Sequence, residues 1–227
     1  DKGPARWHTL NSAWAICQSG LQQSPIDIIQ KDVVQGVSTP MVFNYGPSPY
    51  SVKNTGTSLV FDFSSVNNTV TIGGRMWTLV QFHMHTLSEH AFNGGLFPME
   101  IHFVHADHLG NLAVLGVQVI EGAHNPTFDS AGRLAQIMPD TYGVKYKTSE
   151  TFVLDNLFPA SKSFYHYMGS LTTPPCSENV VWHVFKNPIE MSTAQLDVFL
   201  KQLNNVKTAG PRGQSNRPVQ PLNGRTV

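Results

Sequence analysis

Two pairs of residues constrain this chain more than any other feature. His83 and His85 are separated by one residue, and so are Glu100 and His102. Side chains two positions apart on a β-strand point to the same face, so each pair presents its side chains together. If the two segments are neighbouring strands, three imidazoles converge. The spacing therefore predicts a β-sheet that carries a cluster of three histidines.

A cluster of three histidines points to a metal. Three neutral imidazoles without a fourth protein ligand are typical of catalytic Zn2+, whose open position holds water or hydroxide, whereas structural zinc is closed by four ligands. An isolated His-x-His pair also occurs by chance on a strand face. Glu100 favours the metal interpretation, because it is placed to accept a hydrogen bond from a ligand imidazole.

The amino-acid composition limits which kinds of binding partner are expected. The 227 residues carry 15 basic and 15 acidic side chains, and only 13% of the residues are charged. Nucleic acids and anionic membranes recruit a basic surplus, so neither is expected as a partner. No apolar run approaches the roughly 20 residues that span a bilayer. We expect residues 1–227 to form a single domain, and no oligomeric state is predicted.

The two cysteines, Cys17 and Cys176, lie far apart in the sequence. They are either two buried free thiols or one disulfide that closes a loop of about 160 residues. Such a bridge contributes roughly 5 kcal/mol in the chain-entropy model and indicates an oxidising compartment. Asn67 begins a glycosylation sequon in an expected turn, although it fits better as an ordinary turn residue.

Alternating and apolar runs predict a central sheet. Two short strands, Leu59–Phe63 and Val70–Ile72, are joined by a polar turn of hairpin character. Longer strands are predicted at Met76–His85, Glu100–His105 and Leu112–Ile120. Consecutive neighbours allow the histidine-bearing strands to pair antiparallel. The residues before this sheet are expected to contain little helix.

Two helices are predicted in the second half. Phe128–Met138 is a short helix ended by proline, and Thr193–Leu203 has apolar residues at helical spacing. Ser192 and Gln195 form a capping-box pair at the start of the second helix. Further strands are expected at Thr151–Phe158, Phe164–Met168 and Val180–Phe185.

Several segments in order resemble an α-class carbonic anhydrase over nearly the whole chain. They are Gln23-Ser24-Pro25-Ile26-Asp27-Ile28, Gln81-Phe82-His83-Met84-His85, Ser88-Glu89-His90, Glu100-Ile101-His102-Phe103-Val104-His105, Leu112-Ala113-Val114-Leu115-Gly116, Leu171-Thr172-Thr173-Pro174-Pro175, and Asn216-Arg217-Pro218 before Gln220-Pro221-Leu222. The resemblance implies a mixed, β-dominated domain, with a large, mostly antiparallel twisted sheet, short surface helices and a conical cleft ending at zinc.

The resemblance also implies roles for residues around the metal. His83, His85 and His102 would bind zinc, and Gln81 and Glu100 would hold the ligand rings from behind. The backbone near Asn216 would hold the remaining ring. His90, by resemblance, is a buried structural histidine.

Thr172 and Glu89 resemble the family's gatekeeper pair, in which zinc-bound hydroxide donates to Thr172 and Thr172 donates to Glu89. The plain alternative is a turn threonine and a surface glutamate. The resemblance thus implies reversible hydration of carbon dioxide to bicarbonate and a proton.

An apolar pocket beside the metal is implied for carbon dioxide. Its positions are occupied by Val104, Val114, Leu171, Thr173, Val180 and Trp182. The apolar ones would be unremarkable core residues without the motifs. Bicarbonate, inorganic anions and sulfonamides are expected to compete at the Thr172 backbone amide. The cysteines match the single disulfide of secreted members, which implies a secreted, periplasmic or otherwise extracytoplasmic location.

Two departures from the family pattern matter. Thr57 falls where many members carry a proton-shuttling histidine, and threonine does not titrate near neutral pH. We therefore expect proton transfer to limit turnover. The turn at Asp107–Asn111 is short, and the chain begins after the N-terminal aromatic segment of animal members, so a wider cleft mouth is expected.

Three interpretations follow. The first is an active zinc lyase with the chemistry above. The second is a carbonic anhydrase-like matrix, storage or binding protein with weak or no activity; such members usually lose a zinc histidine, and none is missing here. The third is a zinc hydrolase acting on esters, which the same site can attack weakly as a side reaction.

Overall fold

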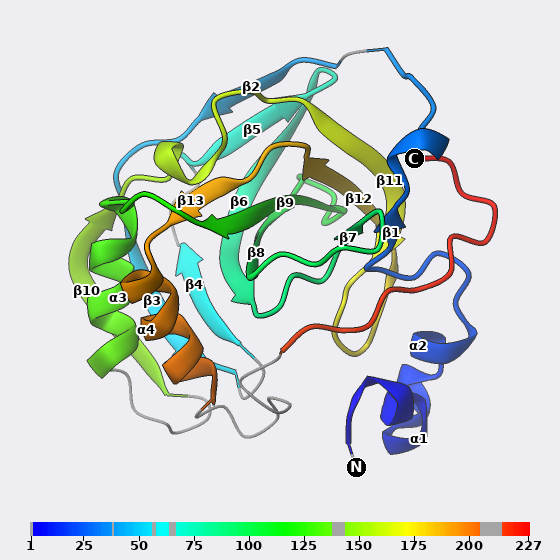
Figure 1. The fold of residues 1–227 in the computed structure, drawn as a ribbon, viewed down its shortest axis with the longest axis horizontal. Coiled ribbons are helices and arrows are strands. Elements are labelled where there is room, and N and C mark those ends of the chain that lie inside the picture. Colours follow the sequence, from blue (N-terminus) through cyan, green and yellow to red (C-terminus); the bar gives the residue numbers. More distant parts are fainter. Residues whose placement is uncertain (1, 38, 56–57, 64–66, 138–143, 205–214) are drawn as a thin grey trace.

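The computed structural model describes residues 2–37, 39–55, 58–63, 67–137, 144–204 and 215–227. Within this part of the chain, eleven strands form one sheet, in which most neighbours run antiparallel (Figure 1). Its main path runs β10 (Lys145–Phe152), β3 (Ser48–Asn54), β4 (Leu59–Phe63), β6 (Arg75–His85), β8 (Met99–Ala106), β9 (Leu112–Glu121), β12 (Glu178–Phe185) and β11 (Phe164–Ser170). The predicted fold class is confirmed.

Three more strands join this path, and two form a separate pair. β2 (Met41–Asn44) pairs with β5 (Thr69–Ile72), β5 pairs with β6, and β13 (Ile189–Met191) runs parallel to β9. β9 and β12 are also parallel. β1 (Asp27–Ile28) pairs with β7 (Ala91–Phe92) outside the large sheet.

The helices are short and peripheral. α3 (Thr127–Ile137) and α4 (Thr193–Asn204) lie side by side near the β10 edge, and both match the predicted helices (Figure 1). The capping box of α4 is present, since Ser192 N donates to Gln195 Oε1 and Gln195 N donates to Ser192 Oγ. No described helix is long and apolar enough to cross a membrane.

The N-terminal region contains more helix than the sequence predicts. Its short turns are η1 (Pro4–Arg6), α1 (Trp7–Leu10), η2 (Ser12–Trp14) and α2 (Ile16–Ser19), and η3 (Gln30–Asp32) follows β1. None exceeds four residues. Helical periodicity needs more than one turn to be visible, so the sequence gives no signal for them.

The predicted hairpin between β4 and β5 is wrong. β4 pairs with the second half of β6, where Val60 lies opposite His83, whereas β5 pairs with the first half, where Thr69 lies opposite Thr78. The long strand β6 therefore pairs with both short strands. The residues 64–66 that connect them lie outside the described part of the chain.

The predicted strand Thr151–Phe158 is also wrong. The strand β10 begins at Lys145 and ends at Phe152, and η4 (Asp155–Leu157) follows. Leu154, Leu157 and Phe158 are buried from this irregular segment, which explains their apolar character without a strand. The described first residues of β10 are mostly exposed, so they carry no apolar alternation.

The central strands separate two apolar clusters. The main core contains Phe61, Phe82, Phe103 and Leu115 on one face of the sheet. The second cluster, called the site-side cluster below, comprises Ile26, Ile28, Val104, Val114, Tyr165, Tyr167, Val180, Trp182 and Val184. Residues of β9 enter both clusters, which is why this strand is almost continuously apolar, whereas β8 alternates apolar residues of the main core with Glu100 and His102.

Candidate metal centre

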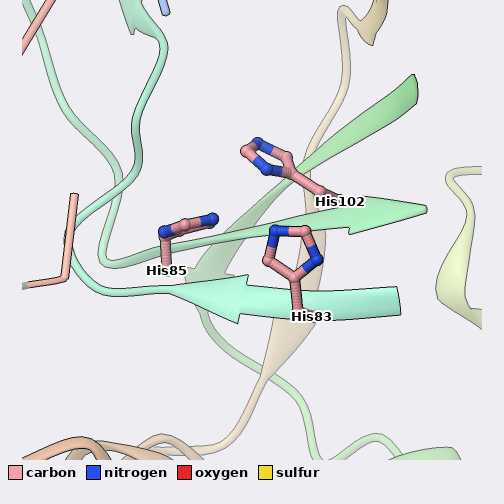
Figure 2. A group of neighbouring side chains, drawn as sticks. All are labelled: His83, His85 and His102. Carbon is pink, nitrogen blue, oxygen red and sulfur yellow. The ribbon is translucent and has the colours of Figure 1, made fainter. Parts of the chain in front are cut away.

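β6 and β8 bring the three histidines together. His83 on β6 lies directly opposite His102 on β8, and His85 follows on the same face as His83. The three rings point toward one another (Figure 2), with ring centroids 4.7–5.3 Å apart. The antiparallel pairing expected from the sequence is therefore present.

A β-bulge at Val80 changes which residues of β6 face the main core. Trp77 and Leu79 enter the main core before the bulge, and Phe82 and Met84 enter it afterwards. The register with β8 shifts between Leu79 and Gln81, so one extra residue of β6 is accommodated there. As a result His83 and His85 face the site-side cluster.

Each imidazole has one nitrogen held by an oxygen. His83 Nδ1 lies 2.8 Å from Gln81 Oε1, and His85 Nδ1 lies 3.1 Å from the carbonyl oxygen of Ser215. His102 Nε2 lies 3.0 Å from Glu100 Oε1. These oxygens accept, so the bonded nitrogens carry the protons. The opposite nitrogens are left as lone-pair donors.

The ligand atoms of the three histidines lie close together. One ligand atom from each histidine lies within 4.8 Å of the others. His85 Nε2 is buried and has no hydrogen-bond partner among the described residues. Burial lowers the pKa of His85 to about 4 and holds the pKa values of His83 and His102 below their usual range. The cluster consists of neutral imidazoles, the state that binds metal.

The cluster is open on one side. His85 and His102 are buried, whereas His83 is only partly buried. His83 is therefore the one of the three histidines that keeps appreciable contact with solvent. Three ligands with one accessible side match a tetrahedral ion that keeps an open position, and the residues fit zinc.

Glu100 holds His102 in place by hydrogen bonding. Its Oε1 accepts from His102 and from His90 Nδ1, and its Oε2 accepts from the backbone N–H groups of Glu89 and His90. Burial disfavours the charged carboxylate of Glu100. His90 and His102 nevertheless hold the pKa of Glu100 well below its usual range. Glu100, His90 and His102 are also close enough to hold a metal, but shared hydrogen bonds already account for their approach.

Glu89 lies next to the free nitrogens. Its Oε2 is 3.5 Å from His85 Nε2 and 3.8 Å from His102 Nδ1, while Oε1 accepts from the backbone N–H of Arg217 at 2.7 Å. Burial raises the pKa of Glu89 to about 7, although His102, Arg217 and a hydrogen bond with the Thr172 side chain each lower it. Thr172 is buried as well. The structure thus brings Thr172 and Glu89 to the histidine cluster.

The expected apolar pocket residues gather beside the cluster. Val104, Val114, Val180 and Trp182 belong to the site-side cluster, and Leu171 packs against it. The Trp182 ring lies 4.8 Å from the His102 ring, centroid to centroid. Thr173, partly buried, lies in the turn between β11 and β12, where its carbonyl oxygen accepts from Cys176 N.

Sequence reasoning missed several supporting residues. Arg217 is buried, and its guanidinium donates to Gln23 Oε1 and to the carbonyl oxygens of Ser24 and Cys17. Gly116 faces Glu100, and a Cβ there would lie 2.9 Å from Glu100 Oε1. Both residues stand inside motifs that carried the resemblance, but only packing reveals what they contact. Thr57 lies outside the described residues.

The comparisons with known proteins agree with this geometry. The family model described as eukaryotic-type carbonic anhydrase matches residues 2–227. A carbonic anhydrase of Neisseria gonorrhoeae is 38% identical, over 99% of this chain and 83% of its own length. One from Nostoc sp. is 37% identical, over 99% of this chain and 82% of its own length.

A solved structure has the same fold. The α-carbonic anhydrase of Thermovibrio ammonificans, in complex with the inhibitor sulfanilamide, superposes with a TM-score of 0.89 at 40% identity. The match covers 99% of this chain and 94% of that one.

Proposed function

Because the chain belongs to the eukaryotic-type (α) carbonic anhydrase family, we propose that it hydrates carbon dioxide with a zinc ion held by His83, His85 and His102. The observation that carries this proposal is the convergence of three neutral imidazoles whose free nitrogens face one another. When bound, zinc lowers the pKa of a coordinated water from about 15.7 to about 7 and so supplies a nucleophile at neutral pH.

Gln81, Glu100 and the Ser215 carbonyl orient the three ligand rings in this proposal. Each accepts a hydrogen bond from the proton-bearing nitrogen of one imidazole. This hydrogen bond fixes the tautomer and raises the basicity of the opposite nitrogen. The donor set contains three nitrogens and no thiolate. Such a set suits a catalytic zinc that retains a water position.

Glu89 and Thr172 orient the attacking oxygen. The Thr172 hydroxyl donates to the Glu89 carboxylate, so Thr172 Oγ1 must accept from the attacking oxygen. With zinc bound, the pair would hold the nucleophilic oxygen in one orientation toward the substrate. Anions and sulfonamides would compete for the backbone N–H of Thr172.

The site-side cluster supplies the place for carbon dioxide. Val104, Val114, Val180 and Trp182 are buried, and Leu171 lies at their edge. An apolar surface beside the open position suits a small apolar substrate and binds charged bicarbonate less well. Product release is thereby favoured.

Metal content and carbon dioxide hydration test the proposal together. Wild-type protein is expected to hold a single zinc ion and to be active, and His102→Ala is expected to lose both. His108→Ala removes an exposed histidine of the turn after β8 and is the matched control. An active His102→Ala protein, or an active wild type without zinc, would contradict the proposal.

Two variants test the orienting pair. Thr172→Val keeps the volume but removes the hydroxyl, and it is expected to lower turnover by about 10²-fold while zinc content stays constant. Thr172→Ser retains the hydroxyl and is expected to keep most of the activity. Equal activity of the two variants would exclude the relay.

The proposed location is extracytoplasmic, and ester hydrolysis is the expected side activity. A buried disulfide joins Cys17 to Cys176, which favours an oxidising, extracytoplasmic compartment. We place the whole of residues 1–227 in one carbonic anhydrase domain. Ester hydrolysis is expected only as a weak side reaction, and comparing ester with carbon dioxide turnover distinguishes it from a dedicated hydrolase.

A further inference from the structure

Two histidines lie opposite each other where the sheet ends at β11. His166 on β11 pairs directly with His183 on β12, and the two rings stack with centroids 4.8 Å apart. β11 is the last strand of the main path of the sheet (Figure 1). Directly opposed residues on antiparallel strands have Cβ atoms about 4.5–5.5 Å apart, so their side chains can reach one ligand together. Neither residue belongs to the three-histidine centre.

The outer histidine has a nitrogen available to a ligand. His166 is exposed, and its Nδ1 donates to the carbonyl oxygen of Trp182 at 3.0 Å. In the neutral ring, the proton is therefore on Nδ1 and the lone pair is on Nε2. A hydrogen bond from one ring nitrogen to a backbone carbonyl is also what orients histidines that bind metals.

The inner histidine has a nitrogen without a partner. His183 is 5% exposed, and its Nδ1 has no hydrogen-bond partner in the part of the chain that the structure describes. Its ring contacts Phe164 with centroids 4.9 Å apart, in addition to its contact with His166. Burial, followed by the nearby His166 and His105, lowers the pKa of His183 to about 3, so the ring is neutral. Buried polar atoms without partners are rare and need an explanation, such as a bound ion or water.

The neighbouring lysines are directed away from this pair. Lys186 Nζ lies 4.8 Å from the centroid of the Tyr165 ring. Tyr165 precedes His166 on β11, so it lies on the opposite face of the strand. Lys162 Nζ donates to the Pro159 carbonyl oxygen at 2.7 Å. The nitrogens of the two imidazoles are thus the groups that a cation would meet.

Two imidazoles select a particular class of cation. No aspartate or glutamate is among the described residues that line the cavity next to His166 and His183. Mg2+ and Ca2+ need several oxygen ligands, whereas imidazole suits Zn2+, Ni2+ and Cu2+. The two ring planes are inclined by 30°, so a modest side-chain rotation directs a lone pair of each ring at one ion.

We propose that His166 and His183 together bind a divalent late transition-metal ion, of which Ni2+ is the probe, through one nitrogen each. Water would complete the coordination on the exposed side of His166. The second imidazole binds an ion already held by the first, so the pair is expected to bind more tightly than any single exposed histidine. This site does not depend on the function proposed above.

Calorimetric titration of Ni2+ into protein loaded with one equivalent of zinc tests the site. Wild type is expected to bind Ni2+ saturably without releasing zinc and to show no response to Mg2+. His166→Asn is expected to bind Ni2+ about tenfold or more weakly, because the chelating pair is lost. His108→Asn removes another exposed histidine and is the matched control, which should bind as wild type does.

Thermal unfolding gives a second measurement. An ion held across β11 and β12 binds only the folded chain, so Ni2+ should raise the melting temperature of wild type and of His108→Asn. It should not raise that of His166→Asn. His183→Leu places an apolar side chain at the buried position and should likewise lose the response to Ni2+. The melting transition without Ni2+ shows whether each variant is folded.

Three results would overturn the proposal. Equal Ni2+ affinity in His166→Asn and wild type would remove the pair from the site. Zinc released in proportion to the Ni2+ bound would assign the ion to the three-histidine centre. Comparable affinities for Mg2+ and Ni2+ would show that oxygen ligands, and not imidazoles, hold the ion.

Discussion

At the scale of single residues, Gly116 determines how closely β9 approaches Glu100. Gly116 lies opposite His102 across β8 and β9, and a Cβ at this position would lie 2.9 Å from Glu100 Oε1. That oxygen accepts the hydrogen bond from His102. A side chain at position 116 would therefore displace the carboxylate that orients a proposed zinc ligand.

Gly116→Ala is expected to reduce both stability and metal affinity. Overpacking should lower the free energy of unfolding by about 1–3 kcal/mol, and the displaced carboxylate should weaken zinc binding by about tenfold or more. Denaturant unfolding and competition with a chelator measure the two effects. Gly132→Ala in α3, where the nearest atom to the new Cβ is 3.9 Å away, is the control and should stabilise slightly. Unchanged zinc affinity in Gly116→Ala would contradict the role given to Glu100.

His105 should make stability depend on pH. It is buried as a neutral ring, with Nδ1 donating to the Phe103 carbonyl oxygen and Nε2 accepting from the Tyr45 hydroxyl at 2.6 Å. Burial lowers the pKa of His105 to about 4. The unfolded chain, with a pKa near 6.5, binds a proton first as pH falls, so the contribution is complete above about pH 6.5 and is lost toward pH 4.

The expected loss from His105 is roughly 2 kcal/mol between pH 7 and pH 5. Denaturant unfolding of wild type and His105→Gln at the two pH values isolates it, because the other titrating groups are common to both proteins. The variant should be less stable at pH 7 and should lose less on acidification. Equal losses in the two proteins would show that folding does not lower the pKa of His105.

Thr57 leads to a prediction about proton transfer. Threonine carries no titratable proton near neutral pH, so on the proposed function we expect the buffer to accept the proton. Turnover of carbon dioxide is expected to rise with imidazole concentration at constant pH and ionic strength. Thr57→His should raise turnover at low buffer and reduce the dependence. Turnover that is insensitive to imidazole would argue against this interpretation.

At residue scale, the sequence shows the three histidines together with two of their hydrogen-bond acceptors, Gln81 and Glu100, but local spacing does not show the third acceptor. The spacing of His83, His85 and His102 is visible in the chain because a strand has a period of two. The acceptor for His85 comes from Ser215, 130 positions away. No local pattern encodes a contact between such distant backbone groups.

At the scale of elements, β6 depends on its bulge. Trp77 and Leu79 occupy odd positions in the main core, whereas Phe82 and Met84 occupy even positions. This change of phase is visible in the sequence and marks the position of the extra residue. Without the extra residue, the histidines would share a face with Trp77 and Leu79.

Deletion of Val80 is expected to abolish zinc binding. The shortened strand must either turn His83 and His85 into the main core or turn Trp77 and Leu79 out of it, and each choice buries the wrong side chains. Val80→Thr, at a position 43% exposed, keeps the length and should remain close to wild type. Zinc content and circular dichroism of the two proteins measure the effect. A deletion variant that retains zinc would contradict the role of the bulge.

The misplaced strand β10 has a physical cause of its own. β10 is an edge strand, and its described first residues are mostly exposed and polar, so it lacks the alternation that identifies buried strands. β3 contains Pro49 opposite Thr151, where the pairing with β10 is irregular. β8 and β9 are buried on both faces, so their buried apolar residues made them predictable as strands.

At the scale of the whole molecule, the disulfide and Arg217 together connect three distant segments. Cys17 and Cys176 are 159 positions apart, and both are buried. Arg217 Nη2 donates to the Cys17 carbonyl oxygen, while the Arg217 backbone N–H donates to Glu89. The N-terminal turns, the Thr172 turn and the C-terminal segment are therefore held around the same site.

Reduction of this disulfide is expected to destabilise the protein. The chain-entropy model gives about 5 kcal/mol for a loop of this length, and strain or residual structure lowers the measured value. Thermal melts with and without a reductant test this expectation. The double variant Cys17→Ser/Cys176→Ser should melt at the temperature of the reduced protein and should not respond to the reductant. An unchanged melting temperature of the wild type on full reduction would contradict it.

The central claim is that three imidazoles hold one zinc ion and leave one position accessible. Anomalous diffraction from crystals of the zinc-loaded protein, recorded on both sides of the zinc absorption edge, tests it most directly. The predicted result is a single strong peak bonded to His83 Nε2, His85 Nε2 and His102 Nδ1, with no fourth protein ligand. A peak elsewhere, or one closed by a fourth side chain such as Glu89, would contradict the account.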